Sequence, residues 1–460
     1  MAGSERREGR RDFLKAAAAG IVGLVVGAAI GSSAFPRRET ITETTTQTTT
    51  VTQQTTVTQT VTQTVAPTRV TAVNNDLTWR VPGKKHIVVV GGGPGGAAFT
   101  RELLHHFPGE KPFVITIVDR HNYWVSGPSH TDFVAGEVPM EKVTVSIDNL
   151  AVKDAVRVVY GTVTSLDPQN RVVYTEVGKI SYDYLVLSPG IDLAWWEVEN
   201  LDKVPNYHAW YPSTALALRE KALALPTGGK VVFAVPSAPY KCPPAPYEVT
   251  LLTAEAVKAK GVKVTLIDAN ANPQPPPKAK IFREWIDKQG VEYISGQKVV
   301  RVDPAAKVVE TDKGEKFSFD LISILPRNLA PAFVRNAGLG ATFMEVDVSK
   351  FRSKKFDDVF GLGDHIAAPY TKSMYAAVTE AQRLADIFAD MFGKRPAEIR
   401  KVNNVCWSYV SKNFLTRIEV WWDDEGKTMP GYPKVDEPTE IFKQHKLAWV
   451  NSMLARYWGP

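Results

Sequence analysis

Short apolar runs rich in β-branched residues recur along the chain, and helical patterns follow several of them. The first run ends in a glycine-rich turn, after which apolar residues recur at helical spacing. Strands that alternate with helical segments are typical of α/β proteins with parallel sheets. The runs that predict strands cover residues 85–90, 113–118, 182–187, 230–235 and 263–268.

The first glycine-rich turn has the pattern of a dinucleotide-binding loop. Gly91, Gly93 and Gly96 match G-x-G-x-x-G. The first glycine permits the tight turn, the second lets the backbone approach a pyrophosphate, and the third lets the helix pack on the strand. Asp119 ends the next strand, where an acid accepts hydrogen bonds from ribose hydroxyls. A glycine-rich turn in another α/β protein is the alternative, but the flanking elements favour the dinucleotide site.

Two later segments indicate FAD as the dinucleotide. A strand that ends in a turn at Pro189-Gly190 resembles the middle flavin motif of flavoproteins with two dinucleotide-binding domains, and Gly363-Asp364 resembles their late motif. Lys372 precedes a predicted helix and either stabilises negative charge on the reduced flavin or is a solvated helix-start residue. The predicted FAD contacts are Gly91, Gly93, Pro94, Gly96, Asp119, Arg120, Pro189, Gly190, Gly363, Asp364 and Lys372.

The second Rossmann-like segment lacks the loop that binds a nicotinamide dinucleotide. Its first strand, residues 230–235, continues into residues 236–248, which contain five prolines and no glycine. Proline has no N–H group to donate to a pyrophosphate. The frame of the domain is kept by the strand at residues 263–268. We therefore expect weak nicotinamide binding and electrons that enter from another donor.

The chain has only two cysteines, Cys242 and Cys406. This excludes a cysteine-rich zinc module and a cysteine-ligated iron–sulfur cluster, and no Cys-x-x-Cys-His motif attaches a haem to this chain. We predict no metal site. A redox disulfide, a structural disulfide of an exported protein and two free buried cysteines are the possible interpretations. The proline-rich surroundings of Cys242, at the altered nucleotide site, favour the redox disulfide.

The N-terminus has the pattern of an export signal. Arg10-Arg11 stands before Phe-Leu-Lys and an apolar run over residues 16–35, which resembles a twin-arginine signal. An ordinary secretory signal or a membrane anchor is the alternative. We expect a protein that is periplasmic or on the outer face of the cytoplasmic membrane. Residues 40–68 are mostly threonine and predict an unfolded spacer, either behind a membrane tether or as a tail of no consequence.

The net charge of +6 does not predict nucleic-acid binding. Much of the excess lies in residues 1–39, and no cluster of basic residues interleaved with aromatics follows.

Three segments together resemble the flavoprotein subunit of flavocytochrome c sulfide dehydrogenase. They are residues 241–248, 361–375 and 404–408, within a likeness that covers residues 84–460. The sulfide:quinone oxidoreductases are a second, closely similar relation. The family often has glycine where this chain has Ala245.

The resemblance implies a sulfide dehydrogenase with a Cys242–Cys406 disulfide over the flavin. Glu248 would then act in proton transfer, or serve as a helix-start carboxylate. Hydrosulfide would be the electron donor, and a c-type cytochrome, or a quinone, the acceptor. FAD would be non-covalent, because no cysteine stands between His121 and Phe133 where some relatives attach it.

Two other functions remain as alternatives. An NAD(P)H-dependent disulfide oxidoreductase would carry closely spaced cysteines and a second glycine-rich turn, and both are missing. A non-enzymatic flavin-binding protein would use the disulfide for stability only. Apolar residues within 435–460 predict one amphipathic helix, which packs on the protein or on a membrane.

The predicted fold is α/β, with two Rossmann-like domains, of which the FAD domain is discontinuous. The predicted order is a signal or anchor (1–35), a Thr-rich spacer (36–80), the first part of the FAD domain (84–200), the second Rossmann-like domain (201–326), the second part of the FAD domain (327–395) and a small C-terminal α+β region (396–460).

Overall fold

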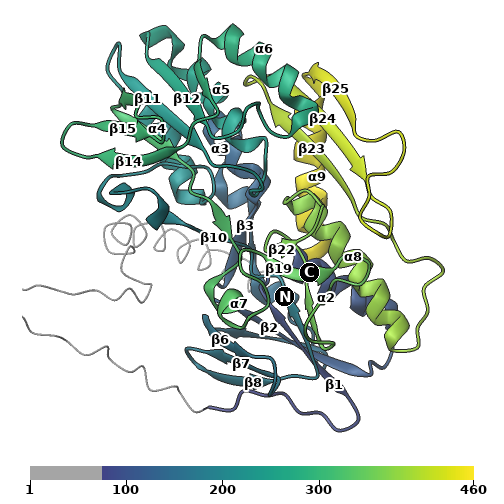
Figure 1. Cartoon of the computed structure of the whole chain (residues 1–460). Coiled ribbons are helices and arrows are strands. Elements are labelled where there is room, and N and C mark those ends of the chain that lie inside the picture. The colour runs from purple at the N-terminus through teal and green to yellow at the C-terminus, as the bar shows by residue number, and fades with distance from the viewer. Residues whose placement is uncertain (1–74, 460) are drawn as a thin grey trace, which may run out of the picture. The chain divides into compact units, whose positions relative to one another are not determined.

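The computed structural model of the protein describes residues 75–459 (Figure 1). The predicted export signal and most of the predicted spacer lie outside the described residues. Residues 75–80 are described, and the Leu77 N–H donates to the Lys179 carbonyl at 2.8 Å. The folded part therefore begins before residue 80, which is earlier than predicted.

The largest sheet is built from two separate parts of the chain. Its order is β22-β19-β20-β21-β9-β1-β2-β5, and β1 pairs in parallel with both β2 and β9. Strand β1 is buried along both faces, which explains its continuous apolar run. The strands are β1 (Lys85–Val90), β2 (Phe113–Asp119), β5 (Val156–Tyr160), β9 (Tyr184–Leu187), β19 (Met344–Asp347), β20 (Arg352–Ser353), β21 (Val359–Gly361) and β22 (Ile366–Ala367).

Two long helices pack beside this sheet. Helix α2 (Pro94–His106) begins directly after the glycine-rich loop, and helix α8 (Met374–Met391) follows the late part of the sheet. Their aromatic side chains interlock, since Phe99 meets Phe388 edge to face at 5.1 Å between ring centroids. This packing therefore fixes the N-termini of α2 and α8 relative to each other.

A second sheet forms the other Rossmann-like unit. Its order is β13-β12-β11-β17, and all three pairings are parallel. Helix α5 (Ala245–Val257) follows β11 after the proline-rich turn. The elements of this unit are β11 (Lys230–Val235), β12 (Lys263–Asp268), α6 (Ala279–Gln289), β13 (Glu292–Ser295), β14 (Val299–Asp303), β15 (Val308–Thr311), β16 (Lys316–Ser318) and β17 (Leu321–Ile324).

The C-terminal region adds an antiparallel sheet and a helix. The sheet contains β23 (Asn403–Tyr409), β24 (Leu415–Trp421) and β25 (Lys434–Thr439), and helix α9 (Ile441–Trp458) follows it. Along α9 the side chains of Val450, Leu454, Tyr457 and Trp458 are buried, so this helix packs on the protein. Within residues 75–459, none of the helices is both long and apolar enough to cross a membrane.

Shorter elements complete the described chain. They are β3 (Tyr123–Val125), α3 (His130–Ala135), β4 (Thr144–Ser146), β6 (Val163–Asp167), β7 (Val172–Thr175), β8 (Gly178–Ser181), β10 (Asp192–Leu193), α4 (Pro212–Leu223), β18 (Asn328–Leu329) and α7 (Ala332–Asn336). The predicted α/β class with two dinucleotide-binding units is confirmed.

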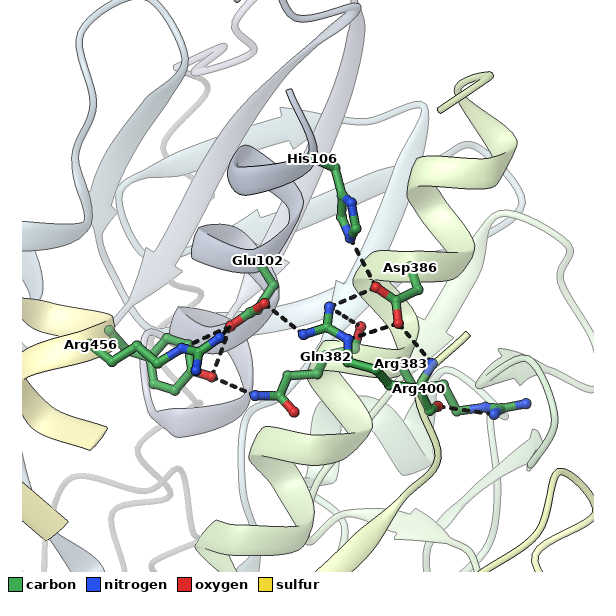
Figure 2. Close-up of polar contacts among 8 residues, drawn as sticks. Glu102, His106, Gln382, Arg383, Asp386, Arg400 and Arg456 are labelled. Atoms are coloured by element: carbon green, nitrogen blue, oxygen red, sulfur yellow. Dashed lines mark hydrogen bonds and ion pairs between the residues drawn. The ribbon is translucent and has the colours of Figure 1, made fainter. Parts of the chain in front are cut away.

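An ion-pair network joins α2, α8 and α9 (Figure 2). Arg400 binds Glu102 of α2 at 2.8 Å and Asp386 of α8 at 2.6 Å. Arg456 of α9 reaches the other oxygen of Glu102 at 2.6 Å. Burial alone raises the pKa of Glu102, but its arginine partners lower the pKa overall. The network therefore locks together three helices, two of which begin at predicted cofactor contacts.

Candidate functional site

The glycine-rich loop has the shape that a bound pyrophosphate requires. Gly91 has φ +102°, and a Cβ added to it would lie 2.3 Å from the Ser188 carbonyl oxygen. A Cβ on Gly96 would lie 1.9 Å from the Gly91 carbonyl oxygen. At Gly93 a Cβ would meet only Trp124, at 3.7 Å, so the loop is open on that side. The loop thus excludes side chains where it packs and leaves room where phosphate would approach.

The other predicted contacts of the adenosine half surround this loop. Pro94 is the first residue of α2, and Asp119 ends β2 with Arg120 next to it. Both carboxylate oxygens of Asp119 accept backbone hydrogen bonds, from Gly92 at 2.7 Å and from His121 at 2.9 Å. Asp119 therefore holds the loop itself, a role that the sequence did not reveal, and each oxygen keeps a lone pair for a ribose.

The middle and late motifs lie at the ends of neighbouring strands. Pro189-Gly190 follows β9, where Gly190 has φ +76°. Gly363 and Asp364 follow β21, which pairs with β9 in parallel. Carboxyl ends of parallel strands meet at one edge of a sheet, where ligands of such folds bind.

Asp364 carries the observation that best tests the fit of FAD. Among the described residues, its buried Oδ1 atom has no hydrogen-bond partner. Burial raises the pKa of this carboxyl group. Buried polar atoms are rarely left unpaired, so a hydroxyl of a ligand is the natural partner. An orphaned acceptor beside Gly363 fits the ribityl chain of FAD.

Lys372 stands at the start of α8, and its side chain is buried. Its ammonium group donates to the Asp364 carbonyl at 2.8 Å and to the Ile366 carbonyl at 2.7 Å. Burial lowers the pKa of Lys372 to about 8. The solvated alternative for this lysine is therefore wrong, and the positive charge lies next to the late flavin motif.

The two cysteines line one cavity of about 370 Å³. In this structure both are free thiols. Cys242 has φ +50°, which is unusual for a residue with a side chain, and its N–H donates to the Lys372 carbonyl at 2.7 Å. This bond ties the cysteine turn to the start of α8. The prolines on the cavity wall are Pro243, Pro244, Pro275, Pro276, Pro277, Pro369 and Pro433.

Glu248 links the two cysteine segments. It lies in the first turn of α5, is 2% exposed, and accepts a hydrogen bond from the Tyr409 N–H of β23 at 2.9 Å. Burial raises the pKa of its carboxyl group. Glu248 is a helix-start carboxylate, as one of the two predictions has it, and its role in proton transfer stays a prediction.

Two buried lysines near the cysteines were missed by sequence reasoning. Lys278 is fully buried, with its ammonium 3.0 Å from the Cys406 carbonyl and 2.8 Å from Ser408 Oγ. Lys446 of α9 pairs with buried Asp132 at 2.8 Å. Lysine is usually a surface residue, so neither burial could be predicted from the local sequence.

Burial raises the pKa of both thiols, and the charged neighbours act in both directions. Burial raises the pKa of Cys406, and the Lys278 ammonium partly opposes this. Burial raises the pKa of Cys242 well above its ordinary value, and the proximity of Cys406 raises it further. The pocket therefore favours at most one negative charge on the pair.

Comparison with known proteins agrees with this geometry. Residues 85–224 match the family of pyridine nucleotide-disulphide oxidoreductases. Residues 214–326 match the central part of the sulfide dehydrogenase [flavocytochrome c] flavoprotein chain. A mitochondrial sulfide:quinone oxidoreductase of Dictyostelium discoideum is 30% identical over 314 residues, which cover 64% of this chain and 68% of that protein.

This chain belongs to the flavoprotein family of the sulfide:quinone oxidoreductases, and its central part is similar to that of the flavocytochrome c sulfide dehydrogenase flavoprotein chain. The predicted resemblance is confirmed. The protein is a flavin-dependent oxidoreductase, and its cofactor is FAD.

Solved structures share the fold of this flavoprotein. The sulfide:quinone oxidoreductase of Aquifex aeolicus superposes with a TM-score of 0.67 at 19% identity, over 82% of this chain and 92% of that one. An NDH2 from Plasmodium falciparum, solved with NADH, gives a TM-score of 0.63 at 15% identity, over 82% and 99% of the two chains.

Proposed function

We propose that this flavoprotein is a sulfide dehydrogenase that oxidises hydrosulfide through Cys242 and Cys406. The supporting observation is that its only two cysteines line one cavity, next to the first turn of α8. That cavity adjoins the turn where prolines replace the glycines of a nicotinamide site. The names of the relatives point to the same donor.

In the proposed reaction, the two cysteines begin as a disulfide. Hydrosulfide attacks one sulfur, a new S–S bond forms, and the old one breaks with its electron pair on the other sulfur. One cysteine then carries a persulfide and the other a thiolate. Bound FAD would accept two electrons from the thiolate and the persulfide, and the two sulfurs so oxidised would be joined by a new S–S bond, which leaves the transferred sulfur between the two cysteines. Glu248 holds or receives the proton released from the persulfide, and Lys372 places positive charge near the late flavin motif.

A c-type cytochrome is the proposed final acceptor, and a quinone is the second candidate. The match to the flavocytochrome c family over residues 214–326 favours the cytochrome. The named quinone oxidoreductases among the relatives favour the quinone. Stopped-flow assays would mix the sulfide-reduced protein with oxidised cytochrome c or with a short-chain ubiquinone. The acceptor class that the protein uses should reoxidise the flavin faster than the other.

We also propose export by the twin-arginine route, to the periplasm or the outer face of the membrane. The paired arginines at the N-terminus support this, since that route carries folded proteins and FAD must be inserted first. Replacing Arg10-Arg11 with Lys-Lys should leave the flavoprotein inside the cell, and fractionation with unchanged export would contradict the proposal.

Anaerobic titration tests the sulfide reaction directly. Sulfide should bleach the visible absorbance of the flavin, whereas NADH should not. Cys242→Ser and Cys406→Ser variants should keep FAD and lose the sulfide-dependent bleaching. Bleaching by NADH alone, or full sulfide activity in both variants, would overturn the assignment.

A further inference from the structure

A hydrogen-bond chain reaches one cysteine of the pair from a fully buried lysine. The Lys278 ammonium donates to Ser408 Oγ at 2.8 Å, and that hydroxyl lies 3.4 Å from the Cys406 sulfur. The hydroxyl accepts from the lysine, so its own hydrogen is free to point at sulfur. Ser408 itself is fully buried, so water does not compete for these bonds.

The ammonium group is held in place by the same strand pair. It also donates to the Cys406 carbonyl at 3.0 Å and to the Thr416 carbonyl at 3.3 Å. Cys406 and Thr416 belong to the paired strands β23 and β24. A buried ammonium is costly unless its hydrogens are bound, and here three oxygens satisfy all three. The Lys278 ammonium is therefore held in place next to Cys406 in a buried environment.

The other cysteine lacks such a chain. Between residues 75 and 459 no hydrogen-bond donor is placed on the Cys242 sulfur, and its favourable charges, Lys241, Lys446 and, more weakly than on Cys406, Lys278, act through space. The charged groups that act on the pair are Lys241 from the cysteine turn, Glu248 from α5, Lys446 from α9 and Lys278 itself, and Asp436 from β25 acts on Lys278. Glu248 opposes negative charge on both sulfurs, so it does not distinguish them.

We propose that Lys278, acting through Ser408, is a positioning residue that holds the negative charge of the reduced cysteine pair on Cys406. This deepens the proposed function and rests on it, because it says which sulfur carries the thiolate that the disulfide chemistry produces. A hydrogen-bonded sulfur next to a fixed cation is the better thiolate. A lysine that served only to fill space would not distinguish one sulfur from the other.

Because the chain contains only two cysteines, each can be studied alone. Cys242→Ser leaves Cys406 as the sole thiol, and Cys406→Ser leaves Cys242. The alkylation rate of each FAD-loaded variant with iodoacetamide, measured by mass spectrometry from pH 6 to pH 10, reports its thiolate fraction. In the Cys242→Ser background, Lys278→Met should slow alkylation at neutral pH by about tenfold or more and shift the profile to higher pH.

The matched control is Lys278→Met in the Cys406→Ser background, where the rate should fall by a clearly smaller factor, because the Lys278 charge reaches Cys242 through space and without a hydrogen-bond chain. Ser408→Ala in the Cys242→Ser background should slow alkylation by a smaller factor. Equal slowing of both cysteines, or an unchanged Cys406 profile, would overturn the proposal. If Lys278→Met does not retain FAD, the Ser408→Ala comparison decides, and an unchanged rate there overturns it as well.

Alkylation does not involve sulfide. Failure of sulfide to bleach the flavin would therefore count against the proposed function alone. An altered alkylation profile would still support the role of Lys278.

Discussion

Asp364 shows how a single side chain can reveal its ligand. One oxygen of its carboxylate, Oδ1, is buried just after β21 and has no partner within the described chain. Leaving such an acceptor unpaired costs free energy, which a ligand hydroxyl would recover. The folded protein is in this sense prepared for FAD before FAD binds.

Replacing Asp364 with alanine should weaken FAD binding by about tenfold or more, because a hydrogen bond to a buried carboxylate is lost. The ratio of visible flavin absorbance to protein absorbance after dialysis would measure this. Asp364→Asn keeps an acceptor oxygen and should retain more FAD. Equal FAD content in the alanine variant and the wild type would show that the orphaned oxygen faces no ligand.

Glycines that a backbone conformation requires could be predicted from the sequence, whereas buried charged residues could not. Gly91 and Gly96 lie where no Cβ fits, so their spacing predicted the loop correctly. The sequence also singled out Cys242 and Cys406, which line one cavity, although their disulfide stays a prediction. Lys278 was missed because its burial depends on the β23–β24 pair, more than 100 residues later in the chain.

Arg400 adds a polar link between α2 and α8, which also pack through Phe99 and Phe388. It binds a carboxylate of α2 and a carboxylate of α8 that are 5% and 2% exposed. Both helices begin at predicted FAD contacts, so the network fixes their relative positions (Figure 2). Removing the arginine leaves buried Asp386 with only His106 and buried Glu102 with only Arg456 as an ion-pair partner.

Arg400→Met should therefore lower the free energy of unfolding by about 3 kcal/mol, at the lower end for a broken buried pair because Arg400 is itself 35% exposed. Chemical denaturation would measure the loss. Arg352→Met is the matched control, since Arg352 pairs with an Asp357 that is 91% exposed, and it should cost less than about 1 kcal/mol. Similar losses in both variants would argue against a special role for the network.

Strands that are buried on both faces were the easiest elements to predict. The runs at residues 85–90, 230–235 and 263–268 coincide with β1, β11 and β12, because parallel strands covered on both sides must be apolar throughout. The short antiparallel strands β14 to β16 were not predicted. One of their faces is solvated and each is brief, so their local pattern resembles that of a loop.

At the scale of the whole molecule, buried neutral histidines tie stability to pH. Burial lowers the pKa of His86 to about 4, and that of His130 and His208 to about 3. In the unfolded chain the pKa of each histidine lies near 6.5. Between pH 6.5 and the lower folded-state pKa values, the unfolded chain therefore binds more protons than the folded protein, and stability falls as the pH falls. Glu380, whose pKa burial raises to about 7, acts in the opposite direction and offsets part of the loss.

His86→Gln isolates one of these contributions. The Nδ1–H group of His86 donates to the Ser181 carbonyl at 2.8 Å, and its Nε2 atom accepts from the Thr116 hydroxyl at 2.7 Å. Glutamine keeps amide groups for hydrogen bonding without titrating. Between pH 7 and pH 5 the wild type should lose about 2 kcal/mol more stability than the variant. Calorimetric Tm values at the two pH values would show this, and parallel shifts in both proteins would contradict it.

The prolines that wall the cysteine cavity have a consequence for which anions can enter. Because proline has no N–H group, the proline part of this wall offers no backbone donors to an oxygen-rich guest such as sulfate, which loses strong hydration on entering. Hydrosulfide, a soft monovalent anion, depends less on such donors and loses less hydration free energy when it leaves water. The cavity would thus select anions by their hydration free energy. Strongly hydrated sulfur oxyanions such as sulfate would compete poorly with hydrosulfide.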